Sequence, residues 1–297
     1  MTLVSPVADT TSDNASRFVL TVSCPNRPGI VRAVTEFIDT RGCSIDEHQQ
    51  FDDAGGGLFF LRTSFGGTES RRIDELRREF ADEVANRHDM SFTLVAADRR
   101  PRIGVLVSKE GHCLNDLVYR WRAGDLGGEL AVVISNHDIL RPMGEAAGLP
   151  YLRIPVTAET KAEAERALRA AIDEHDLDVI VLARYMQVLS DEFCRDFRGR
   201  VINIHHSFLP GFKGARPYHQ AFDRGVKYVG ATAHYVTGDL DEGPIIEQEV
   251  IRVTHAYDAA GLARVGRDAE ALALSRAVRW HCQNRVVLNG TRTVVFS

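Results

Sequence analysis

The sequence lacks paired cysteines and long apolar runs. Its five cysteines, at positions 24, 43, 113, 194 and 282, are widely spaced, and no CxxC pair occurs. This pattern argues against a disulfide framework and against a zinc knuckle. The longest apolar runs, such as DVIVLA at 178–183, are far shorter than the ~20 residues that a membrane helix needs. We therefore expect a protein of the reducing cytoplasm with no membrane partner.

The sequence also lacks an excess of positive charge and a targeting segment. It contains 36 Lys and Arg and 41 Asp and Glu, which gives a formal net charge of −5. This charge does not indicate the basic surface that nucleic-acid binding requires. The opening MTLVSPVADTTSDNAS has neither the positive start nor the apolar centre of a signal peptide, and we expect residues 1–15 to be a disordered tail. The expected partners are small molecules and further copies of the chain, in a dimer or tetramer.

The 297 residues, of which 44% are hydrophobic and 26% charged, fit about two domains of ~150 residues each. Residues 16–98 predict the order βαββαβ, with strands at 17–25, 43–52, 57–65 and 90–97 and helices after Pro28–Gly29 and over 70–88. This order is that of a ferredoxin-like plait. The charged stretch DRRPR contains the predicted linker, 99–102, and a second domain is expected at 103–297.

The second domain alternates near-continuous apolar strands with helices. The strands include IGVLVS, ELAVVIS, DVIVLA and RVINIH. Strands alternating with helices predict a Rossmann-like, doubly wound and mainly parallel sheet with helices on both faces. Ligands of such sheets bind beyond the carboxyl ends of the strands, so the residues at the end of RVINIH are candidates for a site.

Polar side chains of a catalytic kind gather there. Side chains alternate along a strand, so Asn203 and His205 face one way together. An amide can stabilise an oxyanion and an imidazole can carry a proton near neutral pH. His234 lies on the next predicted strand, and Asp241 follows in a turn from which a carboxylate can orient an imidazole. The spacing thus indicates attack on a carbonyl without a nucleophilic side chain.

Two other interpretations of these residues stay open from spacing alone. Asn, His and Asp are common where strands end and turns begin, so they can serve as turn and cap residues. His205, His206, His234 and Asp241 can also be assembled as metal ligands, although no His-x-x-x-His or HExxH pattern occurs on a helix.

Residues 102–297 resemble the folate-dependent formyltransferase family. The resemblance lies in LARYMQVLS, in NIHHSFLPGFKGARPYHQAFDRGVKYVGATAHYV and in DLDEGPII. It implies formyl chemistry on 10-formyltetrahydrofolate without a metal or other cofactor, and it carries the family's Asn-x-His and Asp-x-Gly onto Asn203, His205 and Asp241 as catalytic residues. The resemblance implies that folate is bound by Met186, Gln187, Val188, Leu189, His206, Thr237, Gly238, Asp239 and Leu240.

Departures within this resemblance point to its deformylase branch. His206 stands where the synthetic transformylases usually have proline, and SKEGHCLNDL at 108–117 replaces the Gly-Ser-rich phosphate loop of the ribonucleotide enzyme. The branch implies hydrolysis of 10-formyltetrahydrofolate, the substrate, to formate and tetrahydrofolate. This reaction balances one-carbon pools and supplies formate for purine synthesis. The alternative is formyl transfer to an amine acceptor.

The N-terminal domain resembles the ACT family of small-molecule-sensing domains through CPNRPGIV and GCSIDEHQQ. The resemblance implies side-by-side pairing and an amino-acid effector, glycine or methionine, at the turn that opens the first helix. Free backbone N–H groups at such a turn suit a carboxylate. Purely structural dimerisation remains the alternative. The residues expected to bind the effector are Asn26, Arg27, Pro28, Gly29 and Ile30.

Overall fold

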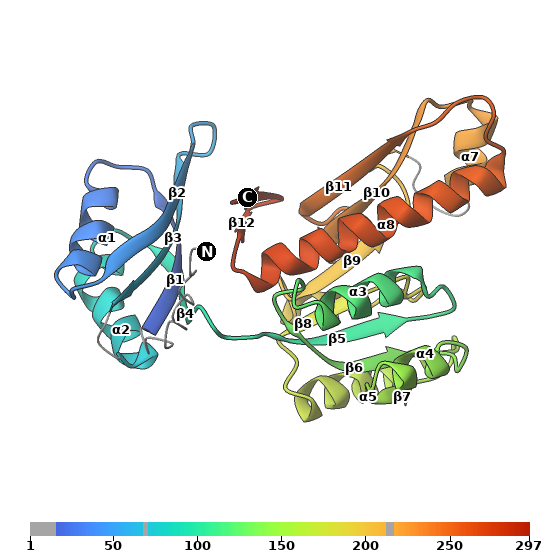
Figure 1. Cartoon of the computed structure of the whole chain (residues 1–297), viewed down its shortest axis with the longest axis horizontal. Helices are drawn as coiled ribbons and strands as arrows, with labels where there is room; N and C mark the ends of the chain where they lie inside the picture. The colour runs from blue at the N-terminus through green and yellow to red at the C-terminus, as the bar shows by residue number, and fades with distance from the viewer. Residues whose placement is uncertain (1–15, 68–70, 212–216) are drawn as a thin grey trace, which may run out of the picture. The chain divides into compact units, whose positions relative to one another are not determined.

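The computed structural model describes residues 16–67, 71–211 and 217–297, and the chain divides into two compact units (Figure 1). The first unit ends at Arg99, and the second covers Arg100–Val295. The predicted tail at 1–15 lies outside the described residues. The division falls within the predicted linker, 99–102, whose last residue already begins a strand.

The first unit is a four-stranded antiparallel sheet in the order β2-β3-β1-β4 with two helices on one face (Figure 1). Its elements are β1 (Ser16–Pro25), α1 (Ile30–Asp39), β2 (Ser44–Asp53), β3 (Leu58–Gly67), α2 (Ile73–Phe80) with a π-helical turn (Ala81–Ala85), and β4 (Ser91–Ala96). Val34 and Phe37 of α1 pack with Leu20 and Leu61 of the sheet, because helical spacing puts the apolar residues of α1 on one side. The predicted βαββαβ order is confirmed.

The second unit holds a seven-stranded sheet in the order β11-β10-β9-β8-β5-β6-β7. Its strands are β5 (Arg102–Val107), β6 (Glu129–Ser135), β7 (Tyr151–Arg153), β8 (Val179–Leu182), β9 (Val201–His205), β10 (Tyr228–Tyr235) and β11 (Ile245–Arg252), with a separate hairpin of β12 (Val286–Asn289) and β13 (Arg292–Val295). Its helices are α3 (His112–Arg122), α4 (Arg141–Ala146), α5 (Lys161–Glu174), α6 (Asp191–Asp196), α7 (Pro217–Asp223) and α8 (Ala259–Cys282). In sheet order, the neighbouring strands β7, β6, β5, β8 and β9 run parallel to one another. By contrast, β10 runs antiparallel to both of its neighbours, β9 and β11.

Both faces of this sheet are buried. One face packs against α3 and α8 through residues such as Val105 and Leu274, and the other packs against α5 and α6 through residues such as Leu106 and Phe193. Successive residues of β5 therefore enter opposite cores, which explains its unbroken apolar run. The predicted mainly parallel sheet with helices on both faces is confirmed.

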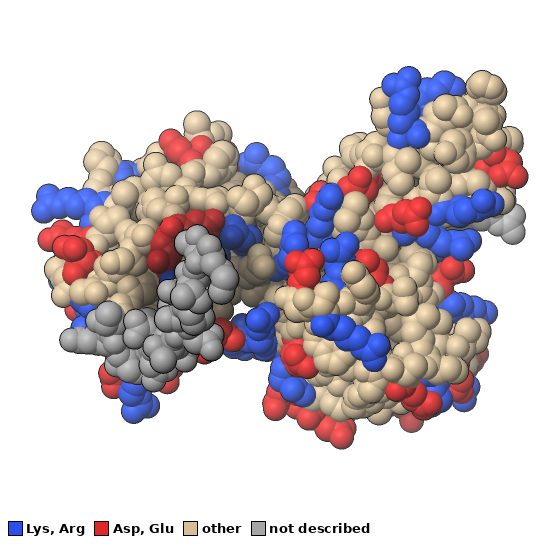
Figure 2. All heavy atoms as spheres, in the orientation of Figure 1, with Lys and Arg blue, Asp and Glu red and all other residues tan. Residues whose placement is uncertain are grey.

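Charged side chains of both signs lie on the surface that Figure 2 draws. On the face that Figure 2 draws, basic and acidic side chains are interspersed over the second unit rather than gathered in one basic stripe. Among the residues that the structure describes, none of the helices combines the length and apolar character that a membrane crossing requires.

Helix α8 gives a direct test of this packing. Replacing the fully buried Leu274 with Ala should lower the free energy of unfolding by ~2–5 kcal/mol, because the deletion leaves a cavity that the core fills only partly. The half-buried Leu272 of the same helix is the matched control, and Leu272→Ala should cost clearly less. Urea unfolding of both variants measures the difference, and equal losses would contradict the packing of α8 described above.

Candidate active site

The register of β9 and β10 brings two polar side chains together. β10 runs antiparallel to β9, with His234 directly opposite Asn203. The Nδ2 atom of Asn203 lies 3.2 Å from Nε2 of His234. The Nδ1 atom of the same ring lies 2.9 Å from the carbonyl oxygen of Tyr235. Because a carbonyl only accepts, Nδ1 carries the proton of the neutral ring, and Nε2 accepts a hydrogen bond from the Asn203 amide.

The loop between β10 and β11 adds a carboxylate to this pair. Asp241 adopts a left-handed backbone with φ 57°, which a short polar residue tolerates better than a bulky one. Its Oδ1 atom lies 3.2 Å from Nδ1 of His205 and 3.8 Å from Nε2 of His234. Two residues later the chain passes so close to the Tyr235 backbone carbonyl that any Cβ at Gly243 would collide with it. The Asp-x-Gly spacing is therefore a steric requirement of the turn.

Asp241 is ionised despite being largely buried. Burial raises the pKa of its carboxyl, but the hydrogen bond from His205 and the nearby His234 imidazole more than offset this and hold the pKa well below its ordinary value. The ionised carboxylate in turn orients the His205 ring through Nδ1. The opposite ring atom, Nε2 of His205, is buried and has no hydrogen-bond partner among the described residues.

His206, the residue after β9, carries a neutral imidazole. Burial, followed by the charges of Arg184 and His205, lowers the pKa of His206 to about 4. Its imidazole is therefore neutral at pH 7 and can both donate and accept a hydrogen bond. The two adjacent rings meet edge to face with their centroids 5.1 Å apart.

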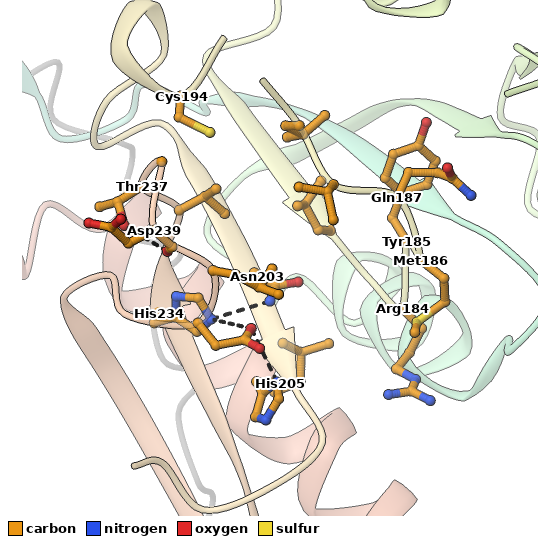
Figure 3. Close-up of a pocket in the computed structure, with 18 of the residues that line it drawn as sticks. Arg184, Tyr185, Met186, Gln187, Cys194, Asn203, His205, His234, Thr237 and Asp239 are labelled. Atoms are coloured by element: carbon orange, nitrogen blue, oxygen red, sulfur yellow. Dashed lines mark hydrogen bonds and ion pairs between the residues drawn. The ribbon is translucent and has the colours of Figure 1, made fainter. Parts of the chain in front are cut away.

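A hollow of about 410 Å³ opens beside these residues (Figure 3). Every residue predicted for catalysis or for folate binding lines it: Asn203, His205, His206, Asp241, the stretch Met186–Leu189 and the stretch Thr237–Leu240. The two stretches come from opposite sides of β9 in the sheet, one after β8 and the other after β10. Most of the exposed lining is apolar, as expected for a site that holds a ring system.

The stretch at 186–189 is held in place from the neighbouring strands. The backbone N–H of Met186 donates to Oγ of Ser108 at 3.0 Å, and that hydroxyl donates to Oδ1 of Asn136 at 2.7 Å. Ser190 then caps α6 by accepting from the N–H of Phe193. These bonds fix the backbone at both ends of the segment 186–190. The side chains of Met186 and Val188 within it are exposed to the hollow.

Comparison with known proteins agrees with this geometry. The sequence model of the Formyl transferase family matches residues 101–278. Formyltetrahydrofolate deformylases of Corynebacterium sp. (strain P-1) and Bacillus subtilis are 50% and 46% identical to this chain, over 94% and 96% of it and 98% and 95% of their own lengths. The chain belongs to the formyltetrahydrofolate deformylase family.

Solved structures of related proteins show the same fold. The crystal structure of a formyltetrahydrofolate deformylase from Burkholderia mallei has a TM-score of 0.90 and 48% identity, covering 95% of this chain and all of that one. A glycinamide ribonucleotide transformylase from Symbiobacterium toebii has a TM-score of 0.65 and 31% identity, covering 69% of this chain and 98% of its own. The deformylase therefore matches nearly the whole chain, whereas the transformylase lacks a counterpart of about a third of it.

The residues predicted for an effector lie between β1 and α1 of the first unit. Asn26, Pro28 and Gly29 are exposed, whereas Ile30, the first residue of α1, has its side chain buried in the core. Arg27 donates to the carboxylate of Asp89 at 3.1 Å. One hollow on this unit lies along α1 and the start of β2, and none of the five predicted residues lines it.

Sequence reasoning missed two charged residues beside the site. Arg184 lines the hollow of about 410 Å³, and Glu270, on α8, is buried near it. Arg184 stood within the matching stretch LARYMQVLS, but nothing in the spacing separated it from solvated arginines. A buried carboxylate is identified by its partners, which are distant in sequence.

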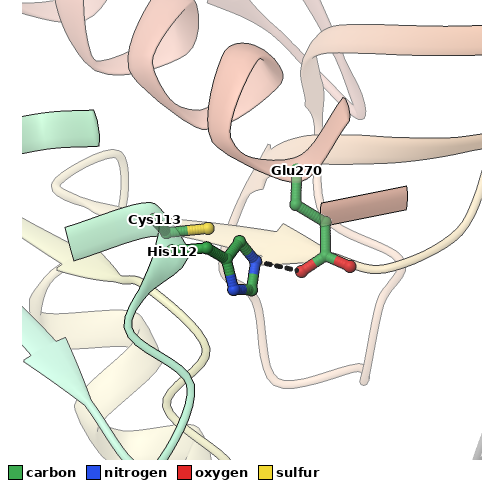
Figure 4. Close-up of side chains that lie close together, drawn as sticks. All are labelled: His112, Cys113 and Glu270. Atoms are coloured by element: carbon green, nitrogen blue, oxygen red, sulfur yellow. Dashed lines mark hydrogen bonds and ion pairs between the residues drawn. The ribbon is translucent and has the colours of Figure 1, made fainter. Parts of the chain in front are cut away.

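Glu270 also belongs to a group of three possible metal ligands, with His112 and Cys113 (Figure 4), whose ligand atoms lie within 4.8 Å of one another. Both carboxylate oxygens are already engaged, one by Nε2 of His112 at 2.9 Å and the other by the Tyr218 hydroxyl at 2.7 Å. Burial raises the pKa of the Cys113 thiol well above its ordinary value, so it is protonated. We interpret the group as a hydrogen-bond network.

The steric role of Gly243 is testable. Gly243→Ala should destabilise the protein by ~1–3 kcal/mol, because the methyl group meets backbone that cannot move aside. It should also displace Asp241 and raise the pKa of that carboxyl towards its ordinary value, which NMR titration measures. The control is Gly55→Ala, where an added Cβ makes only an ordinary 3.6 Å contact with Asp53. An Asp241 pKa unchanged by Gly243→Ala would refute the steric account.

Proposed function

We propose that the protein hydrolyses 10-formyltetrahydrofolate to formate and tetrahydrofolate, balancing one-carbon pools and supplying formate for purine synthesis. The observation that carries the proposal is the ionised Asp241 joined to His205, beside the Asn203 amide, at one side of an apolar hollow. Family membership supports it, because the relatives that match nearly the whole chain are deformylases. The free cysteines fit the cytoplasm as the proposed location.

The proposed reaction is direct addition of water. The water oxygen bonds to the formyl carbon while Asp241 accepts the proton that the water loses, and the carbonyl electron pair moves onto the carbonyl oxygen. The Asn203 amide and the free Nε2 side of His205 stabilise this oxyanion, and loss of one such donor typically costs about 10²–10³ in rate. The C–N10 bond then breaks as N10 takes up a proton, and formate leaves as the anion with release of one proton. His205, coupled to Asp241, is placed to move the proton.

His234 has a positioning role in this scheme. By accepting from Nδ2 of Asn203 it fixes the orientation of the amide, so that the second Nδ2 hydrogen can point at the substrate. Its own ring is fixed by the Tyr235 carbonyl. The neutral His206 is available to hold the attacking water, because a neutral imidazole donates and accepts at once.

Asp241→Asn should lower kcat by about 10²–10⁴-fold, because the amide cannot accept a proton or stabilise a charged His205. KM for 10-formyltetrahydrofolate should change little, since the side chains are nearly isosteric. The assay follows formate and tetrahydrofolate released from 10-formyltetrahydrofolate alone. The control, Asp173→Asn, removes the same charge from the exposed side of α5. A variant that keeps hydrolysis within a few-fold of the parent would exclude Asp241 as the catalytic carboxylate.

The same assay separates hydrolysis from transfer to an amine. With glycinamide ribonucleotide added, formate should remain the product and formylated nucleotide should not accumulate. Glu110 lies in the loop that follows β5, and its Oε2 atom is 4.0 Å from Nδ1 of His112, the first residue of α3. The other ring nitrogen of His112 is hydrogen-bonded to Glu270. An anionic side chain there opposes a phosphate. Formylated nucleotide as the main product would restore the transferase alternative.

We further propose that the first unit is an ACT domain that senses glycine or methionine and joins copies of the chain into a dimer or tetramer. Its ferredoxin-like order supports this, as does the turn at Gly29, which opens α1 with a left-handed φ of 94°. Asn26 lies at this turn, and its backbone is fixed by a 2.9 Å bond to Gly57.

Calorimetry on the full chain should detect binding of glycine or methionine and an accompanying change in kcat. Asn26→Ala should weaken this binding about tenfold, because the side chain is lost while the backbone bond to Gly57 is kept. Gly55→Ala, in the β2–β3 turn, serves as the control. If neither amino acid binds, the unit has a dimerisation role only.

A further inference from the structure

A second hollow, of about 290 Å³, adjoins the folate hollow. Arg184 and His206 line both, so these two side chains form the boundary between them. The remaining wall of the second hollow includes Glu270, His112 and Tyr218. The hydrolysis proposed above needs neither this space nor the charge of Arg184, so both require a separate explanation.

Arg184 is paired with one buried carboxylate and keeps part of its head group free. Its backbone has a left-handed φ of 65°, which is uncommon for a long side chain. Nε lies 3.4 Å from Oε2 of Glu270 in an ion pair without a hydrogen bond, and the two Nη groups likewise make no hydrogen bond to any described residue. In Figure 3 the guanidinium points away from the side chains of Tyr185 and Gln187. A guanidinium fork that is fixed at one edge and open at the other matches the two oxygens of a carboxylate.

Glu270 anchors this cation without filling its free edge. Burial raises the pKa of Glu270, but the hydrogen bond from His112, the charge of Arg184 and the hydrogen bond from Tyr218 more than offset this, so the carboxyl is ionised. Its two oxygens are taken by Tyr218 and His112. Glu110, half exposed on the wall of the second hollow, opposes an anion there, whereas Arg267 on the same wall favours one.

The product of hydrolysis has the chemistry that suits this place. Formate is a small carboxylate that forms beside the ionised Asp241, which repels it. Tetrahydrofolate still occupies the first hollow at that moment. Arg184 is the cation that lines both spaces.

We propose that the second hollow is the exit path of formate and that the free Nη edge of Arg184 is its carboxylate-binding site. The proposal rests on the hydrolysis proposed above. Formate passes from the formyl site to Arg184 and leaves through the second hollow while the folate product is still bound. Added formate should then bind at Arg184 and inhibit the enzyme while a folate is bound in the first hollow. Raising the concentration of 10-formyltetrahydrofolate should therefore not relieve the inhibition.

The test is product inhibition of the full chain by sodium formate. Arg184→Met should weaken this inhibition about tenfold or more, because a charge-assisted bidentate contact is lost, and Arg184→Lys should recover it in part. KM for the folate should change little. Arg264→Met is the matched control, because it removes an exposed charge from α8 outside the hollow and should leave formate inhibition unchanged.

A second variant leaves Arg184 and its ion pair intact. Ala263, on α8, lines the second hollow and not the first. Ala263→Phe should fill part of the exit path, lowering kcat several-fold and weakening formate inhibition without a matching change in KM. This variant tests the path even if Arg184→Met fails to fold.

The outcomes distinguish this inference from the proposed function. A parent enzyme that releases no formate from 10-formyltetrahydrofolate defeats the function itself. A parent that releases formate but is inhibited competitively with folate, or not at all, defeats only the exit path. The exit path is likewise excluded if Arg184→Met and Ala263→Phe both retain the parent's formate inhibition.

Discussion

A buried carboxylate held against two imidazoles is the interaction on which the site depends. Asp241 can stay ionised only because His205 and His234 lie 3.2 and 3.8 Å from its Oδ1 atom. A buried charge without partners is strongly unfavourable, by about 3–5 kcal/mol when one partner of a pair is removed. The positions of β9, β10 and the loop after β10 are therefore coupled, since each supplies one member of the group.

This group can form because β10 runs antiparallel to β9. The chain passes through α7 before it enters β10, and the antiparallel direction of β10 sets His234 across from Asn203. The loop that follows can then bring Asp241 within reach of His205, provided that Gly243 lets the backbone pass Tyr235.

Much of the fold and the central residues of the site could be predicted from the sequence. Strand alternation placed Asn203 and His205 on one side, and the order of strands and helices indicated both fold classes. The family resemblance supplied Asp241, whose closeness to His205 no local pattern reveals. Arg184 and Glu270 could not be predicted, because their meaning depends on a contact between residues far apart in sequence. The antiparallel direction of β10 was likewise a matter of tertiary pairing.

The second unit thus contains two buried carboxylates with opposite consequences for an anion. Asp241 faces the folate hollow with its charge balanced by imidazoles, so a newly formed formate meets a negative group there. Glu270 uses its charge to fix His112, Tyr218 and one edge of Arg184, which leaves a cation exposed at the boundary. In the proposed exit path, these charges favour the position of a small carboxylate beside Arg184 over a position beside Asp241. The two carboxylates therefore act together, because Asp241 repels the anion and Glu270 holds the cation that receives it.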